Sequence, residues 1–298
     1  MFDSMGSILE ALSPEQQIAC STQNNILLTA CPGSGKTRTL THRLAYQVLR
    51  DPASKKIKIA ITYTNRAAEE ITNRLEGMNI DQSSIWAGTI HQFCMHFIIR
   101  PYAMYSKRLC KGYRIIDDYS KKAYGREIAE RLGMHLNYYD DPFQYENVRT
   151  EYKRVLKEKK EIDFDAILLI SEELLASCAF IGSNIASVIS SILVDEFQDT
   201  NELQYSILST IYKANKSIIL MFVGDVNQAI YSSLGGVAKG KKELETLYEI
   251  NFDSLSLKGC YRSTQRLVDL YSRFEISKTD AHSVAKYKDE HGEIHFFD

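Results

Sequence analysis

The sequence predicts an α/β fold in which helices flank a parallel sheet, with a small helical insertion. Short apolar runs at 26–30, 57–63, 191–194 and 217–223 have the length and composition of buried strands. Helical patterns follow several of these runs, and strands that alternate with helices are typical of parallel sheets. A glycine-rich turn comes directly after the first run, at the end of a strand where open α/β sheets bind ligands.

Length and composition narrow the class of protein. A chain of 298 residues can bury a large core and usually forms more than one domain. The net charge is −2, so a polyanion must be bound by a local patch. The six cysteines are scattered, which favours reduced thiols over a zinc site or a disulfide framework. No signal peptide or membrane-spanning run is visible, and we expect a cytoplasmic protein without a membrane partner.

The first helical segment is expected after a ragged terminus that ends near Ile8. Ser13 can cap a short helix, Pro14 suits its first position, and Gln16 lies where the reciprocal partner of the cap belongs. A second helix is predicted from Lys36 to Arg50, because leucine and valine repeat every four residues on one face.

The glycine-rich turn, Gly33-Ser34-Gly35-Lys36-Thr37, has the pattern of a phosphate-binding loop. Gly33 and Gly35 permit backbone conformations that a Cβ forbids, so consecutive N–H groups, Ser34 among them, can point at phosphate oxygens. Lys36 would reach the β- and γ-phosphates of a nucleotide. The Thr37 hydroxyl would bind Mg²⁺, which prefers hard oxygen ligands.

Two further strand ends lead into helices. The run at 57–63 continues into an Ala/Glu-rich helical stretch at 65–71, and residues 86–94 repeat this arrangement. Because parallel strands end at the same edge of a sheet, these exits are expected beside the phosphate-binding loop.

The segment 100–160 differs in composition from the rest. It contains 15 Lys/Arg against 9 Asp/Glu and nine of the 18 tyrosines, with helical patches and glycine-containing breaks. We interpret it as an inserted helical subdomain. Its positive charge indicates either contact with a nucleic acid duplex or strand, or a solvated helical face.

Acidic residues follow the strand at 191–194. A helix capped by an acidic residue is predicted from 162 to about 179, and Asp195 and Glu196 come directly after the strand. Burying carboxylates is unfavourable unless a cation pairs with them, and Mg²⁺ is the natural partner here. Asp195 would hold the metal, usually through water, and Glu196 would orient and deprotonate the water that attacks the γ-phosphate.

Three further elements are predicted in the last third of the sequence. The strand at 217–223 leads to Gln228, which would sense the γ-phosphate or would be an ordinary residue at a strand exit. Residues 254–264 start another strand-to-helix unit, and a further strand is expected at 293–297.

Taken together, these motifs resemble the N-terminal ATP-binding portion of superfamily-one DNA helicases of the UvrD/Rep/PcrA type. The matching stretches are Leu-Ser-Pro-Glu-Gln at 12, Ala-Cys-Pro-Gly-Ser-Gly-Lys-Thr-Arg at 30, Thr-Tyr-Thr-Asn-Arg-Ala-Ala at 62, Gly-Thr-Ile-His-Gln-Phe-Cys at 88, Asp-Phe-Asp at 163, Val-Asp-Glu-Phe-Gln-Asp-Thr-Asn at 194, Val-Gly-Asp-Val-Asn-Gln at 223 and Tyr-Arg-Ser-Thr-Gln at 261.

The resemblance implies a RecA-like P-loop NTPase that uses ATP and Mg²⁺. It implies a first RecA-like ATP-binding domain at 1–99 and 161–258, the inserted helical subdomain at 100–160, and the start of an incomplete second RecA-like domain at 259–298. The family's later motifs are missing, so we expect slow turnover by this chain alone.

The resemblance also assigns roles to individual residues. Gln16 would read the adenine edge, while Arg38 and Tyr261 would sandwich the base between a guanidinium and an aromatic face. Arg262 would stabilise negative charge on the γ-phosphate during hydrolysis. Four further residues match positions along the family's track for single-stranded DNA: Tyr63, Asn65, His91 and Tyr231. The two tyrosines could instead be ordinary core residues.

Two functional hypotheses remain. The first is a DNA helicase motor that binds single-stranded or forked DNA. The second is a nucleotide- or DNA-sensing subunit that does not unwind and that is paired with a nuclease in antiviral defence, as in the small helicase-like subunits of Gabija-type systems. Ser233 and Leu234 favour the second, because the family usually has a DNA-stacking aromatic and an arginine there. The Gln-Asp-Thr-Asn run and the Tyr-Arg pair argue against a kinase or GTPase.

Overall fold

The computed structural model describes residues 5–137, 139–228, 238–276 and 278–290. They form two compact units, one made of Met1–Ile90 and Ser183–Asp298 and the other of His91–Gly182. Among the described residues, no helix has the length and apolar character needed to span a membrane.

The first unit is built on a six-stranded sheet in the order β3-β2-β6-β7-β1-β8, and every neighbouring pair is parallel. This confirms the predicted fold class and places all six carboxyl ends at one edge. The strands are β1 (Ile26–Ala30), β2 (Ile57–Thr62), β3 (Ile85–Thr89), β6 (Ile189–Val194), β7 (Ile219–Gly224) and β8 (Asp253–Leu257).

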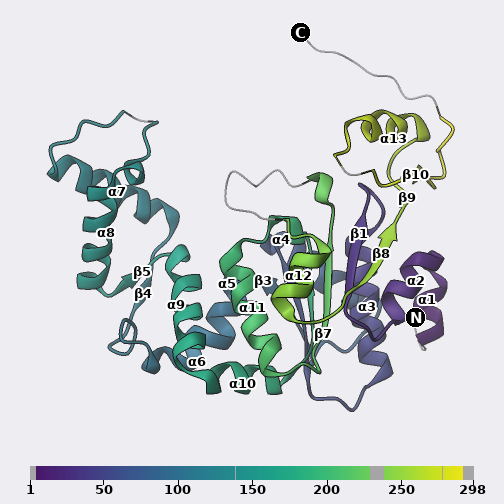
Figure 1. The fold of residues 1–298 in the computed structure, drawn as a ribbon, viewed down its shortest axis with the longest axis horizontal. Helices are drawn as coiled ribbons and strands as arrows, with labels where there is room; N and C mark the ends of the chain where they lie inside the picture. Colours follow the sequence, from purple (N-terminus) through teal and green to yellow (C-terminus); the bar gives the residue numbers. More distant parts are fainter. Residues whose placement is uncertain (1–4, 138, 229–237, 277, 291–298) are drawn as a thin grey trace, which may run out of the picture. The chain divides into compact units, whose positions relative to one another are not determined.

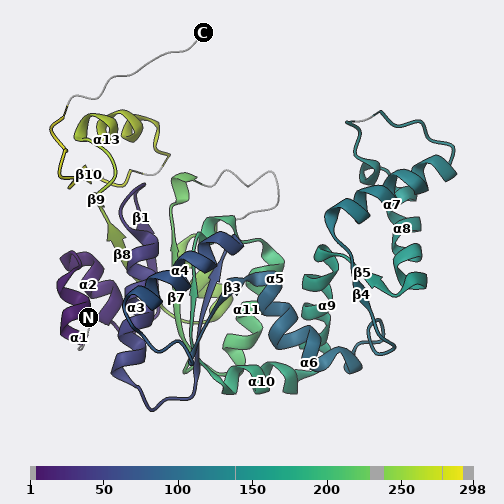
Figure 2. The same ribbon diagram turned by 180° about the vertical axis from the view of Figure 1, so that it is seen from behind.

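Helices cover both faces of this sheet. The two views agree that α3 and α4 lie on one face and α11 and α12 on the other (Figures 1 and 2). The helices of this unit are α1 (Met5–Glu10), α2 (Pro14–Ser21), α3 (Lys36–Arg50), α4 (Asn65–Gly77), α11 (Glu202–Ala214), α12 (Lys241–Tyr248) and α13 (Gln265–Tyr271), with short 3₁₀ turns at Phe197–Asp199, Val226–Gln228 and Ser272–Phe274.

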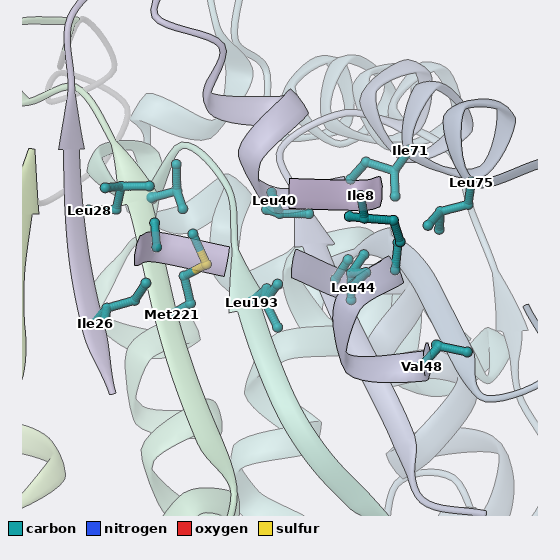
Figure 3. Packing of buried hydrophobic residues seen from close by; sticks show 14 of the residues in the cluster. Ile8, Ile26, Leu28, Leu40, Leu44, Val48, Ile71, Leu75, Leu193 and Met221 are labelled. Carbon is teal, nitrogen blue, oxygen red and sulfur yellow. The ribbon is translucent and has the colours of Figure 1, made fainter. Parts of the chain in front are cut away.

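Alternation along β7 explains the two layers. Met221 and Val223 face a core of aliphatic side chains from β1, β6, α1, α3 and α4 (Figure 3). Phe222 points the other way, where its ring packs against Tyr205 of α11 and Tyr248 of α12. Because successive side chains of a strand point to opposite faces, an unbroken apolar run such as β7 is suited to a sheet that is covered on both sides.

Helix α1 was not anticipated. The terminus was expected to be ragged up to Ile8, yet Met5–Glu10 is helical and the Ile8 side chain is fully buried beside Leu40 and Leu44 of α3. Burial of a side chain of this size contributes about 1.5–3 kcal/mol, which favours the packing of this six-residue helix on α3.

The predicted helix starts are reproduced. Ser13 and Gln16 form a reciprocal capping box at the start of α2, with Pro14 at the first helical position. Asp163 caps α9 (Phe164–Ser177) by accepting the Ala166 N–H. Both caps satisfy N–H groups that have no partner within the helix.

The last part of the first unit is a short parallel pair, β9 (Gly259–Cys260) with β10 (His282–Ser283), beside α13. Cys260 and Val268 of this part form a buried cluster with Cys31, which directly follows β1. The strand expected at 293–297 lies outside the described residues.

The second unit is mainly helical. Its elements are α5 (Ile90–Phe93), which begins at the last residue of the first unit, a π-helix (Cys94–Ile99), α6 (Arg100–Tyr102), β4 (Arg114–Ile115), α7 (Asp118–Arg131), α8 (Glu146–Lys159), β5 (Glu161–Ile162), α9 (Phe164–Ser177) and α10 (Ala179–Ser187), which continues into the first unit, with 3₁₀ turns at Ala103–Tyr105 and Pro142–Gln144.

This unit runs from 91 to 182 and is therefore wider than the insertion expected at 100–160. The difference has a physical reason. Cys94 and Ile98 in the π-helix and Leu174 in α9 are all buried, and the two helices pack on each other. The helices that flank the insertion thus pack on each other and belong to the same compact unit as the insertion.

Candidate active site

The phosphate-binding loop has the backbone geometry that its glycines predict. Gly33 and Gly35 have φ values of +74° and +83°, and Gly35 is the residue before the first turn of α3. A Cβ on Gly33 would lie 2.6 Å from the Cβ of Arg262, so this position requires glycine for space as well as for conformation.

Residues from five separate segments line one cavity of about 270 Å³ in the first unit. The loop and the start of α3 form one part, and Glu196, Gln228 and Arg262 come from after β6, after β7 and after β9. The structure therefore brings together most of the predicted site, and the lining residues are Pro32, Gly33, Ser34, Gly35, Lys36, Thr37, Arg38, Glu70, Arg74, Glu196, Gln228 and Arg262.

An ion pair on the wall of this cavity connects the two motifs. Lys36 Nζ donates to Glu196 Oε2 at 2.9 Å, although the two residues are 160 positions apart in the chain. The Glu196 carboxylate also accepts a hydrogen bond from Gln198 Nε2 at 2.8 Å. Glu196 itself has a left-handed backbone, with φ of 51°, which costs a non-glycine residue about 1–3 kcal/mol. Strain of this kind is common at functional sites.

Gln198 links this carboxylate to the next strand. Its Oε1 accepts the Asp225 N–H at 3.1 Å, directly after β7. A Cβ on Gly224 would lie 2.2 Å from the same oxygen, so only glycine leaves room for the link. Gln198 thereby fixes the position of Glu196 relative to the carboxyl ends of β6 and β7.

Three aspartates, of which Asp195 and Asp225 are buried and Asp199 is half-buried, interact electrostatically with the ion pair. The pKa of Asp195 is raised to about 7, mainly by burial and also by the neighbouring Glu196 carboxylate, while Lys36 opposes the shift. Burial also raises the pKa of Asp199 and of Asp225. Each of these last two has one buried oxygen without a hydrogen-bond partner in the described structure, Asp199 Oδ1 and Asp225 Oδ2. Such a site favours an added cation.

The donor set at this edge of the sheet fits Mg²⁺. Asp195 and the hydroxyl of Thr37 are hard oxygen donors, and Mg²⁺ usually takes one or two protein oxygens and completes its shell with water and phosphate. Within the described part of the chain, no group of three or more His, Cys, Asp or Glu side chains is arranged to hold a metal without such additional ligands.

The loop also has an unused donor. The Ser34 hydroxyl is buried and has no hydrogen-bond partner among the described residues. Together with the Lys36 ammonium, it gives the cavity groups that can bind an anion such as a phosphate.

The residues expected around the base are placed as follows. Gln16 is buried, its Oε1 accepts the Ser13 N–H, and its Nε2 donates to the Ser34 carbonyl at 3.0 Å. Arg38 donates to the Ala11 carbonyl at 2.6 Å. Tyr261 is 43% exposed, and its N–H donates to the Gly33 carbonyl at 2.9 Å. In this structure Gln16 supports the phosphate-binding loop, and its role toward adenine stays a prediction.

The four residues expected to contact single-stranded DNA do not all lie in one unit, and one of them is outside the described residues. Tyr63 is 48% exposed after β2, so it is not a core residue, and Asn65 starts α4. His91 lies in the second unit, where its ring makes an edge contact with Phe164 at 6.0 Å and burial lowers its pKa. Tyr231 lies outside the described residues, as do Ser233 and Leu234.

Sequence reasoning missed three residues of the cavity region. Glu70 and Arg74 of α4 line the cavity and form an ion pair of 2.6 Å, and Gln198 orients Glu196. The spacing of four between Glu70 and Arg74 is a sequence signal for a pair on one helical face. That this face borders the cavity depends on how α4 packs.

A family model and several curated proteins match this chain. The AAA domain family matches residues 15–234. The ATP-dependent DNA helicase PcrA of Leuconostoc citreum is 28% identical over 279 residues, which are 84% of this chain and 37% of that protein. DNA helicase II of Escherichia coli (strain K12) is 26% identical over 290 residues, 88% of this chain and 40% of that protein. The chain thus spans about two fifths of the length of these relatives.

Among solved structures, the crystal structure of Pif1 helicase from Candida albicans overlaps 87% of this chain and 43% of that chain, with 13% identity and a TM-score of 0.45. The fold assignment stands on the strand order described above. The family match covers more than half of the residues. This chain therefore belongs to the AAA domain family, as a UvrD/PcrA-like N-terminal portion of the superfamily-one helicase type.

Proposed function

We propose that this chain is the ATP-binding motor portion of a DNA helicase or translocase, which hydrolyses ATP with Mg²⁺ and binds single-stranded DNA. The observation that carries the proposal is the ion pair between Lys36 and Glu196 on the wall of one cavity. It places a cation suited to phosphate beside a carboxylate suited to water activation. The relatives, which are named as an ATP-dependent DNA helicase and as DNA helicase II, support the same activity.

In the proposed mechanism the residues of the site share four tasks. The loop N–H groups and Lys36 bind the phosphates, and Lys36 leaves Glu196 when it does so. Glu196, held by Gln198, then orients a water molecule and accepts its proton. Arg262, with Gln228 nearby on the cavity wall, stabilises the charge that develops on the γ-phosphate. Thr37 and Asp195 would hold Mg²⁺, which when bound neutralises phosphate charge.

The domain organisation extends this proposal. Residues 1–99 and 161–258 would form the first RecA-like domain, 100–160 the main part of the inserted subdomain, and 259–298 would belong to a second RecA-like domain. Because the chain spans 37% to 40% of its relatives' length, we propose that it turns over ATP slowly on its own. A cytoplasmic location is a separate part of the proposal.

A second function, a DNA-sensing subunit that works with a nuclease in antiviral defence, is favoured by Ser233 and Leu234. Neither residue is aromatic. Without an aromatic side chain to stack on DNA at this place, ATP hydrolysis would be less tightly coupled to movement along the strand.

The test measures ATP hydrolysis with and without a single-stranded oligonucleotide, and strand separation on a forked duplex. The motor proposal predicts Mg²⁺-dependent hydrolysis that the oligonucleotide stimulates. Hydrolysis without strand separation, by this chain and by any longer form of the protein, supports the second function. Absence of ATP binding contradicts both.

A further inference from the structure

The second unit contains a cavity that the proposed function does not use. It has a volume of about 530 Å³, within the range of about 300–1,000 Å³ that is usual for ligand sites. One wall is the face of α7 that carries Asp118, Lys122 and Arg126 at intervals of four residues. The other wall is the segment from Tyr139 to Phe143.

This wall is held against α7 by close packing. Gly125 of α7 is buried, and a Cβ there would lie 2.8 Å from the Phe143 ring and 3.1 Å from Pro142. Lys121 lies 5.5 Å from the centre of the Phe143 ring. The cavity is therefore formed by packed elements of a single unit.

The charged groups of the cavity are not equivalent. Asp140 accepts the Asn137 N–H and Asp141 accepts the Phe143 N–H, so both carboxylates serve the backbone of their own turn. Lys121 Nζ is 2.5 Å from Asp165, which balances its charge.

Lys122 is exposed and has no ion pair or hydrogen bond within the described residues. Arg126 lies one helical turn further along α7 and lines the same cavity. This face of α7 thus places Lys122 and Arg126 at the cavity, together with Asp118 in the first turn of the helix, where the helix dipole favours a carboxylate.

An aromatic ring completes the site. The side chain of Tyr139 is 93% exposed, although it borders the cavity. Exposed aromatic faces beside basic side chains are the usual means by which proteins bind single strands without reading their sequence. The base stacks on the ring, and the cations contact the phosphate.

We propose that this cavity is a binding site for one nucleotide of single-stranded DNA, whose base stacks on Tyr139 and whose phosphate contacts Lys122 and Arg126. The proposal rests on the proposed function, because it adds a contact for the same class of ligand. It also gives a role to the excess of lysine, arginine and tyrosine in this part of the sequence.

The experiment measures binding of a fluorescein-labelled oligothymidylate by fluorescence anisotropy over a range of salt concentrations. Tyr139→Ala is expected to weaken binding about five- to a hundredfold, because it removes one stacking surface. Tyr139→Phe keeps the ring and should bind as the unchanged protein does. Tyr119→Ala is the matched control, since Tyr119 is 83% exposed on α7 but does not line the cavity.

A second variant tests the phosphate contact. Lys122→Gln should lower the slope of log affinity against log salt by about 0.7, the value for one phosphate of a single strand, whereas Lys153→Gln on α8 should not change it. Duplex of the same sequence should bind with an affinity that Tyr139→Ala leaves unchanged, because paired bases are not free to stack.

The inference is overturned if Tyr139→Ala binds the oligonucleotide normally, if Tyr119→Ala weakens binding equally, or if an acidic peptide displaces the oligonucleotide as well as unlabelled DNA does. ATP hydrolysis measured without DNA separates the two proposals. Normal hydrolysis with any of these results leaves the proposed function standing, whereas loss of ATP binding by the unchanged protein contradicts the proposed function instead.

Discussion

Glu196→Gln is expected to lower the rate of ATP hydrolysis by about 10²–10⁴-fold, the usual contribution of a general base. The amide has the shape of the carboxylate but cannot accept a proton from water. Because it also removes the negative partner of Lys36, which is 2.9 Å away, the affinity for ATP should stay the same or rise. Single-turnover hydrolysis and equilibrium binding of a fluorescent ATP analogue measure the two effects separately.

The matched control for this variant is Glu249→Gln. Glu249 also pairs with lysines, Lys213 and Lys216, but it caps α12 and does not line the cavity. It should leave both hydrolysis and ATP affinity unchanged. A Glu196→Gln protein that hydrolyses ATP at the normal rate would show that another group activates the water.

Lys36→Ala is expected to weaken binding of ATP by about ten- to a hundredfold, because it removes a charge-assisted contact to the phosphates. The same change leaves Glu196 without its cationic partner near the buried carboxyl groups of Asp195 and Asp225 and the half-buried one of Asp199, so the cavity becomes more negative and repels the nucleotide. Isothermal titration calorimetry with a non-hydrolysable ATP analogue measures the loss.

Lys216→Ala controls for the removal of a surface lysine, since Lys216 pairs with Glu249 outside the cavity. The midpoint of thermal unfolding, measured for both variants, separates loss of binding from loss of folding. ATP affinity that survives in a folded Lys36→Ala protein would count against the assignment of the loop.

Much of the first unit could be predicted because it depends on local patterns. The apolar run at 217–223 and the glycine turn at 33–37 each specify their own conformation, and both lie where the sequence predicts them. The order of strands could not be predicted. The strand β1 pairs with β7 and β8, which lie far along the chain from it: Ile26 is opposite Met221 on one side and Asp253 on the other. The extent of the second unit likewise depended on which helices share a core.

The site shows the same division. The loop and the pair Asp195-Glu196 were recognisable as motifs, and the structure places Lys36 in contact with Glu196. Gln198 was not recognised, because its role depends on the distance between the ends of β6 and β7, which no local pattern gives. Gln16 was recognised as a cap partner, and its second contact, with Ser34, depends on how α2 packs on α3.

The central claim is that the ends of β1 and β6 act on one magnesium-bound triphosphate. The most direct test measures the affinity of a non-hydrolysable ATP analogue as a function of Mg²⁺ concentration, for the unchanged protein and for Asp195→Asn. The variant keeps the shape of the side chain and its acceptor for the Glu196 N–H. We predict that Mg²⁺ strengthens binding to the unchanged protein and has little effect on the variant. An equal effect of Mg²⁺ on both proteins would contradict the account.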